Sequence, residues 1–151
     1  MKFIVTKELG RLARWLRILG YDTEYFLNSN RSSLVITSLR DERIILTRNS
    51  RMSPVSGIRI ARIKHDELKK QLAQVMKELD IKPDEKALFT RCVLCNKKLK
   101  EVEKETIKGK VPEYVYGAQK DFVICPGCGR VYWHGTHWGN VRKLLAEARV
   151  G

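Results

Sequence analysis

Residues 2–26 read KFIVTKELGRLARWLRILGYDTEYF and contain the alternation of elements that decides the fold. The apolar run Lys2–Val5 predicts a buried strand, and Thr23–Phe26 predicts a second one. Between them, Glu8–Leu19 has the length and the apolar period of a helix that Gly20 closes. A strand, a helix and a strand in this order favour a parallel α/β sheet.

The same alternation continues to about residue 80, after which the composition changes. The further elements expected are a helix at Ser33–Arg40 with a serine as its cap, strands at Arg43–Thr47 and Ile58–Ile63, and helices at Asp66–Leu79 and Val141–Val150. The charged stretch Lys82–Lys86, which includes Pro83, predicts a linker. We therefore expect two units, an α/β domain at 1–86 and a smaller unit at 87–151.

The composition of the chain is that of a folded protein. It has 151 residues, of which 43% are hydrophobic and 31% are charged, and these values are near globular averages. No apolar run approaches the roughly 18 residues that cross a bilayer. The first ten residues lack the long apolar stretch of a secretory signal. These features predict a cytoplasmic protein without membrane contact.

The charge of the chain points to a polyanionic partner. Thirty Lys and Arg against 17 Asp and Glu give a formal net charge of +13, and such a field attracts nucleic acids. Residues 43–65 contain six basic residues and no acid, which predicts one strongly positive face. On the first helix, Lys7, Arg11 and Arg14 lie opposite the apolar arc. The alternative is a solvated basic surface without a partner.

All four cysteines occur in two close pairs, Cys92–Cys95 and Cys125–Cys128, with 29 residues between the pairs. Each pair can place two thiolates on one side of a tight turn, and two such turns make a tetrahedral site for Zn²⁺. Asn96 and Gly129 follow the pairs, where turn-tolerant residues let the backbone curl. The metal would hold together a segment too small for a sufficient core of its own. Two disulfides or a redox pair are the alternatives. The expected zinc ligands are Cys92, Cys95, Cys125 and Cys128.

Histidines and large aromatic residues follow the second cysteine pair. His134 and His137 are not needed as ligands, because four thiolates complete a zinc shell. We interpret them as packing, RNA-contacting or outer groups. Tyr132, Trp133 and Trp138 could be core residues or platforms on which bases stack, and core is favoured for the tryptophans because a small ribbon has few other large apolar residues.

Four segments and one histidine, taken in chain order, carry a resemblance to a known family. They are Phe3–Asp22, Arg43–Arg48, Arg91–Asn96 and Cys125–Trp133, with His137, and they span nearly the whole chain. Together they resemble the PIN-like ribonuclease family, in the branch named for the C-terminal domain of the Mut-seven exonuclease. The resemblance implies a three-layer PIN-like α/β domain joined to a small C-terminal zinc ribbon. It also implies metal-dependent RNA cleavage as the presumed activity of the family.

Several positions depart from what the resemblance implies. PIN-like nucleases hold Mg²⁺ or Mn²⁺ with a cluster of carboxylates, because hard cations need oxygen ligands. In members of the family an Asp usually stands where this chain has Thr6, and another where it has Asn49. A further common acid is missing around Ser32 and Ser33. The remaining candidates for catalytic acids are Glu8, near the carboxyl ends of the strands, and Asp22, which precedes its strand.

These departures predict an RNA-binding protein whose catalytic site is degenerate. One alternative is an active metal-dependent endoribonuclease that uses the residual acids, or a partner's carboxylate, with Mg²⁺ or Mn²⁺. Another is a protein-interaction module in a ribonucleoprotein, which would bind free RNA weakly. The residues expected to contact RNA phosphates are Lys7, Arg11, Arg14, Arg17, Arg48 and Arg51.

Overall fold

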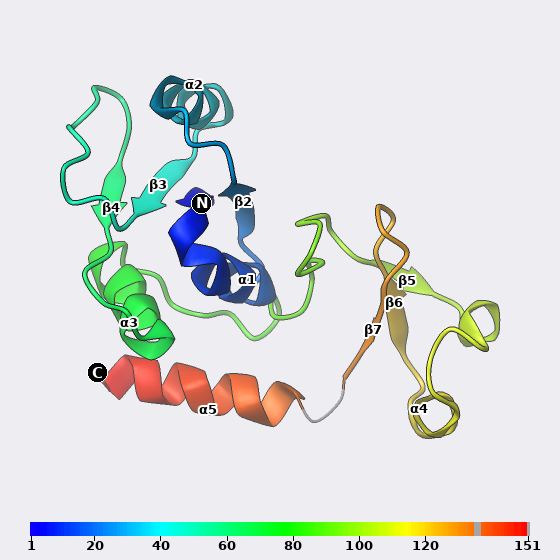
Figure 1. The fold of residues 1–151 in the computed structure, drawn as a ribbon. Coiled ribbons are helices and arrows are strands. Elements are labelled where there is room, and N and C mark those ends of the chain that lie inside the picture. Colours follow the sequence, from blue (N-terminus) through cyan, green and yellow to red (C-terminus); the bar gives the residue numbers. More distant parts are fainter. Residues whose placement is uncertain (135–136, 151) are drawn as a thin grey trace.

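The N-terminal part of the chain forms a four-stranded parallel sheet (Figure 1). We describe residues 1–134 and 137–150 from a computed structural model of the chain. The strands are β1 (Lys2–Thr6), β2 (Asp22–Phe26), β3 (Ile44–Thr47) and β4 (Ile60–Arg62). Their order is β2-β1-β3-β4, and each neighbouring pair runs parallel. The predicted parallel α/β fold is confirmed.

The helices of this domain lie close to their predicted positions. They are the 3₁₀ turn η1 (Lys7–Leu9), α1 (Gly10–Ile18), α2 (Arg31–Asp41) and α3 (Leu68–Glu78). The cap of α2 differs from the prediction. The side chain of Asn30, rather than a serine, accepts a hydrogen bond from the Ser33 N–H at 3.2 Å. Asn and Ser are equally good caps, so the sequence pattern did not distinguish the two.

Both faces of the sheet are covered, which gives the domain three layers. On one face, Phe3 and Val5 belong to the same buried cluster as the apolar sides of α1 and α3. On the other face, Ile4 and Ile45 pack with Leu34 of α2. Successive side chains of β1 thus point to opposite faces, and helices cover both faces, as is usual for a parallel sheet.

The turn after α1 receives the chain that follows the predicted linker. Gly20 has φ +94°, and a Cβ at this position would lie 2.4 Å from the carbonyl oxygen of Ala87. Leu88 is buried in the same cluster as α1. The N–H of Phe89 donates to the carbonyl of Ile18 at 2.9 Å. The chain just beyond the linker therefore lies against the end of α1.

The second unit is built around a three-stranded antiparallel sheet. Its elements are β5 (Lys100–Val102), η2 (Lys104–Ile107), α4 (Glu113–Ala118), β6 (Phe122–Ile124) and β7 (Val131–Trp133). β6 lies between the other two strands. Its Phe122 packs with Ile107 and Val115 in a small core of its own. An antiparallel sheet beside four clustered cysteines is consistent with the expected zinc ribbon.

The last helix, α5 (His137–Val150), returns to the parallel-sheet domain (Figure 1). Its Val141, Leu145 and Ala148 are buried in the same cluster as α1 and α3. The predicted closing helix thus adds to the core of the first unit, although it follows the ribbon in the chain. The boundary between residues 86 and 87 stays a prediction. Within the described ranges, no helix is both long enough and apolar enough to cross a membrane.

Candidate functional site

The carboxyl ends of β1 and β3 lie side by side. Together with the first few residues after β1, β3 and β4, they form what we call the carboxyl edge of the parallel sheet. Thr6 ends β1 and Thr47 ends β3, and their hydroxyl oxygens are 3.1 Å apart. In open α/β sheets, ligands bind beyond this edge. Thr6, where the resemblance implies an acid, therefore does lie where a ligand would bind.

Glu8 follows β1 in η1 and its carboxylate reaches the carboxyl edge. One carboxylate oxygen, Oε1, accepts hydrogen bonds from Thr6 Oγ1 at 2.5 Å and from the Arg48 N–H at 3.0 Å. The Thr47 hydroxyl lies 3.3 Å from the same oxygen. Burial raises the pKa of Glu8, but the hydrogen bonds from Thr6 and Arg48 outweigh it and hold the pKa below its ordinary value of 4.5. Glu8 is thus a fixed negative charge at this edge.

A second carboxylate at this edge, Asp66, was missed by the sequence analysis. The guanidinium of Arg48 donates to the Asp66 carboxylate and, at 2.7 Å, to the carbonyl of His65. The Asp66 side chain is 92% exposed. The sequence pattern assigns Asp66 only to the start of a helix. Its position soon after β4 is the signal that could have found it, because residues that follow parallel strands gather at the same edge.

The other positions where the resemblance implies acids hold neutral side chains in local turns. The carbonyl oxygen of the Asn49 side chain accepts from the Arg51 N–H at 3.0 Å. Ser32 and Ser33 lie in the first turn of α2, the helix that follows β2. Among the described residues, the four cysteines are the only group of three or more Cys, His, Asp or Glu side chains close enough to hold an ion.

Asp22 lies at the opposite edge of the sheet from Glu8. In the parallel register of β1 and β2, Asp22 pairs with Lys2, whereas Thr6 pairs with Phe26. The Asp22 carboxylate accepts from Arg43 Nη1 at 2.8 Å and from the Asn96 side-chain amide at 2.6 Å. Burial raises the pKa of Asp22, but these two hydrogen bonds outweigh it and hold the pKa below its ordinary value of 3.8. The structure does not bring the two candidate acids together.

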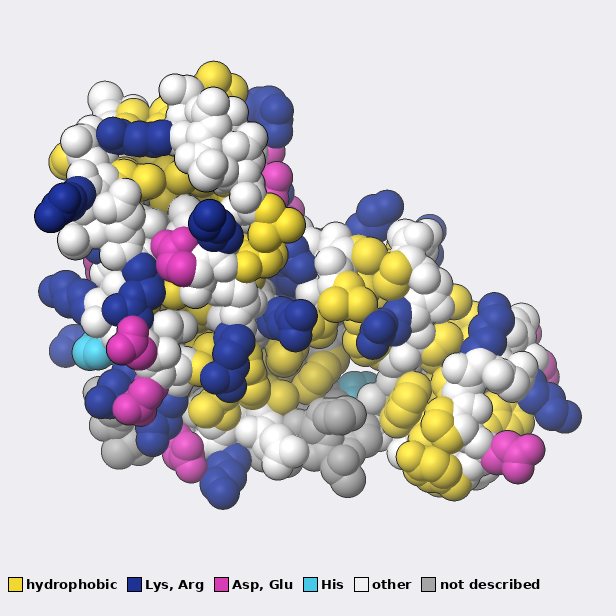
Figure 2. All heavy atoms as spheres, in the orientation of Figure 1, with side chains coloured by type: hydrophobic (Ala, Val, Ile, Leu, Met, Phe, Trp, Pro, Cys, Tyr) yellow, Lys and Arg dark blue, Asp and Glu magenta, His cyan; other side chains and the backbone are white. Residues whose placement is uncertain are grey.

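The basic residues expected to contact RNA differ in exposure. Lys7, Arg11, Arg14 and Arg51 are exposed, and Arg48 is half-buried. Figure 2 shows Lys and Arg side chains spread over much of the visible face of the parallel-sheet domain. Four of the six residues can thus reach a ligand in solvent.

Arg17 differs from the other basic residues because its side chain is buried. It is 8% exposed, and its guanidinium donates to the carbonyl oxygens of Thr23, Val93 and Leu94 at 2.9, 2.8 and 3.2 Å. These contacts tie α1 to β2 and to the first cysteine turn. We therefore assign Arg17 to the contact between the two units and leave it out of the RNA surface proposed below.

A hollow of about 350 Å³ lies along α1, between the carboxyl edge and the first cysteine turn. Arg11 and Arg14 line it, together with Tyr25 of β2 and with Val93 and Leu94 of the turn. The Tyr25 hydroxyl donates to the carbonyl of Lys7, which fixes the ring beside α1. We call this the basic hollow, because two exposed arginines stand at its wall.

The four predicted metal ligands come together in the structure. The sulfur atoms of Cys92, Cys95, Cys125 and Cys128 all lie within 4.8 Å of one another, and none of these cysteines forms a disulfide. The sulfurs of Cys92 and Cys128 are 3.7 Å apart. Zinc–sulfur bonds of about 2.3 Å in a tetrahedron place the sulfurs about 3.8 Å apart. The donor set and its spacing therefore fit a zinc ion.

The two cysteine turns are built alike. In each, the N–H of the second cysteine donates to the sulfur of the first, at 3.4 Å and 3.5 Å. The N–H of the next residue donates to the carbonyl of the first cysteine at 2.9 Å in both turns. That next residue is Asn96 with φ 66° or Gly129 with φ 76°. Both positions need the left-handed conformation that Asn and Gly tolerate, as the sequence indicated.

Tyr132 of β7 supports the first cysteine turn. Its hydroxyl oxygen lies 3.1 Å from the sulfur of Cys92 and accepts from the Val93 N–H at 3.2 Å. Burial raises the pKa of Cys92, but hydrogen bonds from Tyr132 and from backbone N–H groups outweigh it and lower the pKa to about 7. The thiolate is the form that binds metal ions, so these contacts favour at Cys92 the form that zinc requires. The pKa of Cys95, the other thiol of this turn, is instead raised to about 12 by its hydrogen bond with Cys128 and by burial.

Comparison with known protein families identifies a match over most of the chain. A family model described as the Mut7-C RNAse domain matches residues 1–145. Among curated proteins and among solved structures, no match was found. The matched range includes both the parallel-sheet domain and the four cysteines.

Proposed function

Since this chain belongs to the Mut7-C RNase domain family, we propose that it is an RNA-binding protein whose carboxyl edge has lost the carboxylates that a metal-dependent nuclease needs. An RNase domain implies RNA as the ligand. The net charge of +13 agrees with a phosphate backbone as the main contact.

One observation carries this proposal, namely the arrangement around Glu8. Hard divalent cations take several oxygen ligands, most often from carboxylates. At the ends of β1 and β3, however, the side chains are two threonine hydroxyls, and both lie within 3.3 Å of the same oxygen of Glu8. That oxygen also accepts the Arg48 N–H. This oxygen is thus already hydrogen-bonded to neutral donors, and the ends of β1 and β3 add no further carboxylate, which together support the loss of a metal site.

The basic residues around this edge suit a phosphate backbone. Lys7 and Arg51 flank the edge, and Arg11 and Arg14 continue along α1. Neutral residues at Thr6 and Asn49 leave less negative charge to compete with a phosphate. Phosphate contacts hold a nucleic acid in place without reading its sequence. We therefore expect affinity without strong sequence preference.

The zinc site has a structural role in this proposal. The ligands would be Cys92, Cys95, Cys125 and Cys128. Four thiolates would complete the coordination of Zn²⁺ and leave no open position for water or substrate. The ion would hold the two cysteine turns together and so stabilise the ribbon.

A second candidate function, metal-dependent RNA cleavage, is favoured by the placement of Asp66. Arg48 contacts both acids of the carboxyl edge, through its N–H to Glu8 and through its guanidinium to Asp66. Two carboxylates and a substrate phosphate could supply oxygen ligands to Mg²⁺ or Mn²⁺. Cleavage would then need Asp66 to leave Arg48.

Cleavage of end-labelled RNA, measured beside binding of the same RNA, separates the two candidates. The arms are Mg²⁺, Mn²⁺ and no added divalent ion; omission is preferable to EDTA, because EDTA would also remove zinc. Glu8→Gln and Asp66→Asn keep the shapes of the two side chains, and Asp22→Asn tests the acid at the opposite edge. Tight binding without cleavage in every arm is the expected result. Metal-dependent cleavage that Glu8→Gln or Asp66→Asn removes would overturn the proposal.

A further inference from the structure

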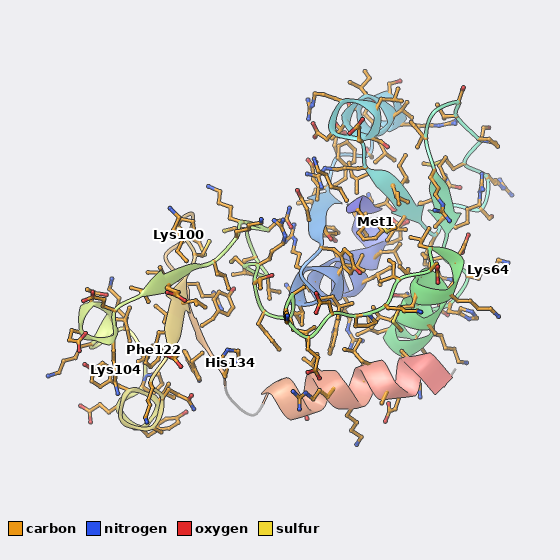
Figure 3. The ribbon with its side chains drawn as sticks, turned by 180° about the vertical axis from the view of Figure 1, so that it is seen from behind. Met1, Lys64, Lys100, Lys104, Phe122 and His134 are labelled. Carbon is orange, nitrogen blue, oxygen red and sulfur yellow. The ribbon has the colours of Figure 1, made fainter. Side chains whose placement is uncertain are left out.

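A recess of about 600 Å³ lies between the parallel-sheet domain and the ribbon, and the proposed function does not use it. Aromatic side chains from three separate segments line it: Trp15 of α1, Phe89 beyond the linker, and Tyr132 and Trp133 of β7. Figure 2 shows hydrophobic side chains exposed between the two lobes. Figure 3 places His134, which also lines the recess, where the chain leaves the ribbon. The volume is that of an ordinary ligand pocket.

Two of these rings are held in place by contacts with neighbouring residues. The Tyr132 hydroxyl contacts Cys92 and Val93. Trp133 meets Phe122 edge to face, with ring centres 6.3 Å apart. All four aromatic side chains are half-buried, so each keeps part of its surface accessible from the recess. Rings fixed in this way lose little freedom when a flat ligand stacks on them.

The recess adjoins the basic hollow. Val93 of the first cysteine turn lines both. Arg11 and Arg14 line the hollow. A strand that runs from the carboxyl edge along α1 would therefore meet a basic surface first and the aromatic recess after it. Proteins that bind single-stranded nucleic acids combine these two features, a positive groove for the backbone and aromatic rings for the bases.

We propose that the recess binds unpaired bases of a single RNA strand, while the phosphates of that strand lie along Arg11 and Arg14. The proposal rests on the proposed RNA binding and adds to it that the ligand is single-stranded. The bases of a duplex are stacked and paired, so they could not enter a pocket of this kind without being flipped out.

Charge at the recess agrees with bases rather than phosphates inside it. Glu85, Glu101 and Asp121 are exposed side chains of its lining. Carboxylates repel a phosphate, but they accept hydrogen bonds from the exocyclic amino groups of adenine, cytosine and guanine. Glu85 lies 3.5 Å from Arg142, and Lys86 also lines the recess, so these two cations offset part of the negative charge of this wall. The positive charge of the hollow thus suits the phosphate of a nucleotide, and the hydrogen-bond acceptors of the recess suit its base.

Binding and tryptophan fluorescence of the full-length zinc-loaded protein test this inference. The probes are an unstructured RNA of about 12 nucleotides, the same sequence as a duplex, and an inorganic polyphosphate of similar charge. We expect the single strand to bind at least about tenfold more tightly than the duplex, since stacking contributes substantially for each base. The single strand should quench tryptophan fluorescence, whereas polyphosphate should bind without quenching because it has no bases.

Trp15→Leu and Trp133→Leu remove a stacking face while keeping an apolar side chain. Each should weaken binding of the single strand about fivefold to tenfold and leave polyphosphate binding unchanged. Tyr114→Leu is the matched control, because Tyr114 is 79% exposed on α4 and does not line the recess. The quenching measured on the unmodified protein does not depend on whether a variant folds.

The outcomes separate this inference from the function on which it rests. Equal affinity for single strand and duplex, without quenching, would overturn the recess as a base-binding site and leave RNA binding intact. This result would favour an apolar protein segment as its occupant. Failure of every RNA to bind would overturn the proposed function itself.

Discussion

The side-chain amide of Asn96 donates to the carboxylate of Asp22 at 2.6 Å, and its carbonyl oxygen accepts from the Thr23 N–H at 2.8 Å. Asn96 is the left-handed residue of the first cysteine turn, and Asp22 begins β2. Arg43, next to β3, reaches the same carboxylate. One hydrogen-bond network therefore joins the candidate zinc site to the amino end of the parallel sheet, and the stability of the two units should be coupled.

Replacing Asn96 tests this coupling. Asn96→Gly preserves the positive φ of the turn but removes both hydrogen bonds to β2, so we expect the free energy of unfolding to fall by about 1–3 kcal/mol. Zinc content should stay at one ion per chain, because the cysteines are unchanged. Denaturant unfolding and elemental analysis measure the two quantities. The control is Gly129→Asn in the second turn, where φ is also positive and nothing lies within 4 Å of an added Cβ. If Gly129→Asn lowered the free energy of unfolding as much as Asn96→Gly, the conformation of the turn, rather than its contact with β2, would account for the loss of stability.

The low pKa of Asp22 gives a pH dependence with a definite sign. Burial raises this pKa, while hydrogen bonds from Arg43 and Asn96 lower it below the ordinary 3.8. A carboxyl whose pKa is lower in the folded state adds stability above its ordinary pKa, and this stability is lost as the pH falls through the folded-state pKa. Acid also releases zinc, so the measured quantity is the difference in unfolding free energy between the native protein and Asp22→Asn. That difference should be constant above about pH 5 and shrink below pH 4. A difference that grows on acidification would contradict the assignment.

Patterns in the sequence predicted the elements well because each depends on neighbouring residues. The apolar period of α1, the strand runs and the cysteine spacing are all local signals. Local signals also explain the wrong expectation for Arg17. Its neighbours in the sequence make it look like one more exposed arginine, but its contacts are with the distant residues Thr23, Val93 and Leu94.

The parts of the site that the sequence did not predict depend on contacts between distant segments. Asp66 joins the carboxyl edge only because β4 pairs with β3. The recess needs Trp15 and Trp133 from opposite ends of the chain. No spacing rule in the sequence connects such positions, so only the three-dimensional structure shows that they lie together.

Removal of zinc should act mainly on the ribbon. Cys92→Ser, or a zinc chelator, should abolish the bound ion and expose the backbone amides of residues 91–133 to hydrogen exchange, because the metal supplies much of the folding free energy of so small a unit. Val141 and Leu145 pack on the first domain, so we expect α5 to keep most of its protection. Hydrogen exchange followed by mass spectrometry measures both regions. Unchanged exchange across the ribbon after the zinc has been removed would argue against a structural metal.

The salt dependence of RNA binding should report the phosphate contacts in the basic hollow. Changing Arg11 and Arg14 together to Gln should weaken binding to all RNA sequences alike and lower the slope of log K against log salt by about 1–2. Lys2→Gln with Arg40→Gln removes the same number of charges at the opposite edge, so its slope should change less. Titrations at several salt concentrations provide the slopes. Equal changes in the two double variants would mean that net charge, not position, governs binding.

The close approach of Gly20 to Ala87 should make this glycine irreplaceable for stability. A Cβ at Gly20 would lie 2.4 Å from the carbonyl oxygen and 2.9 Å from the Cβ of Ala87, in a backbone conformation with φ +94°. Gly109→Ala is the matched control, because Gly109 has φ +85° and open space around it. In the control, the free energy of unfolding should fall only by the cost of the left-handed conformation, about 1–2 kcal/mol. Gly20→Ala should lower the free energy of unfolding by about 1–3 kcal/mol more than the control does, because the chain beyond the linker must move away from the end of α1. Denaturant unfolding of both variants gives the comparison, and similar losses would mean that this segment is not packed against α1 in solution.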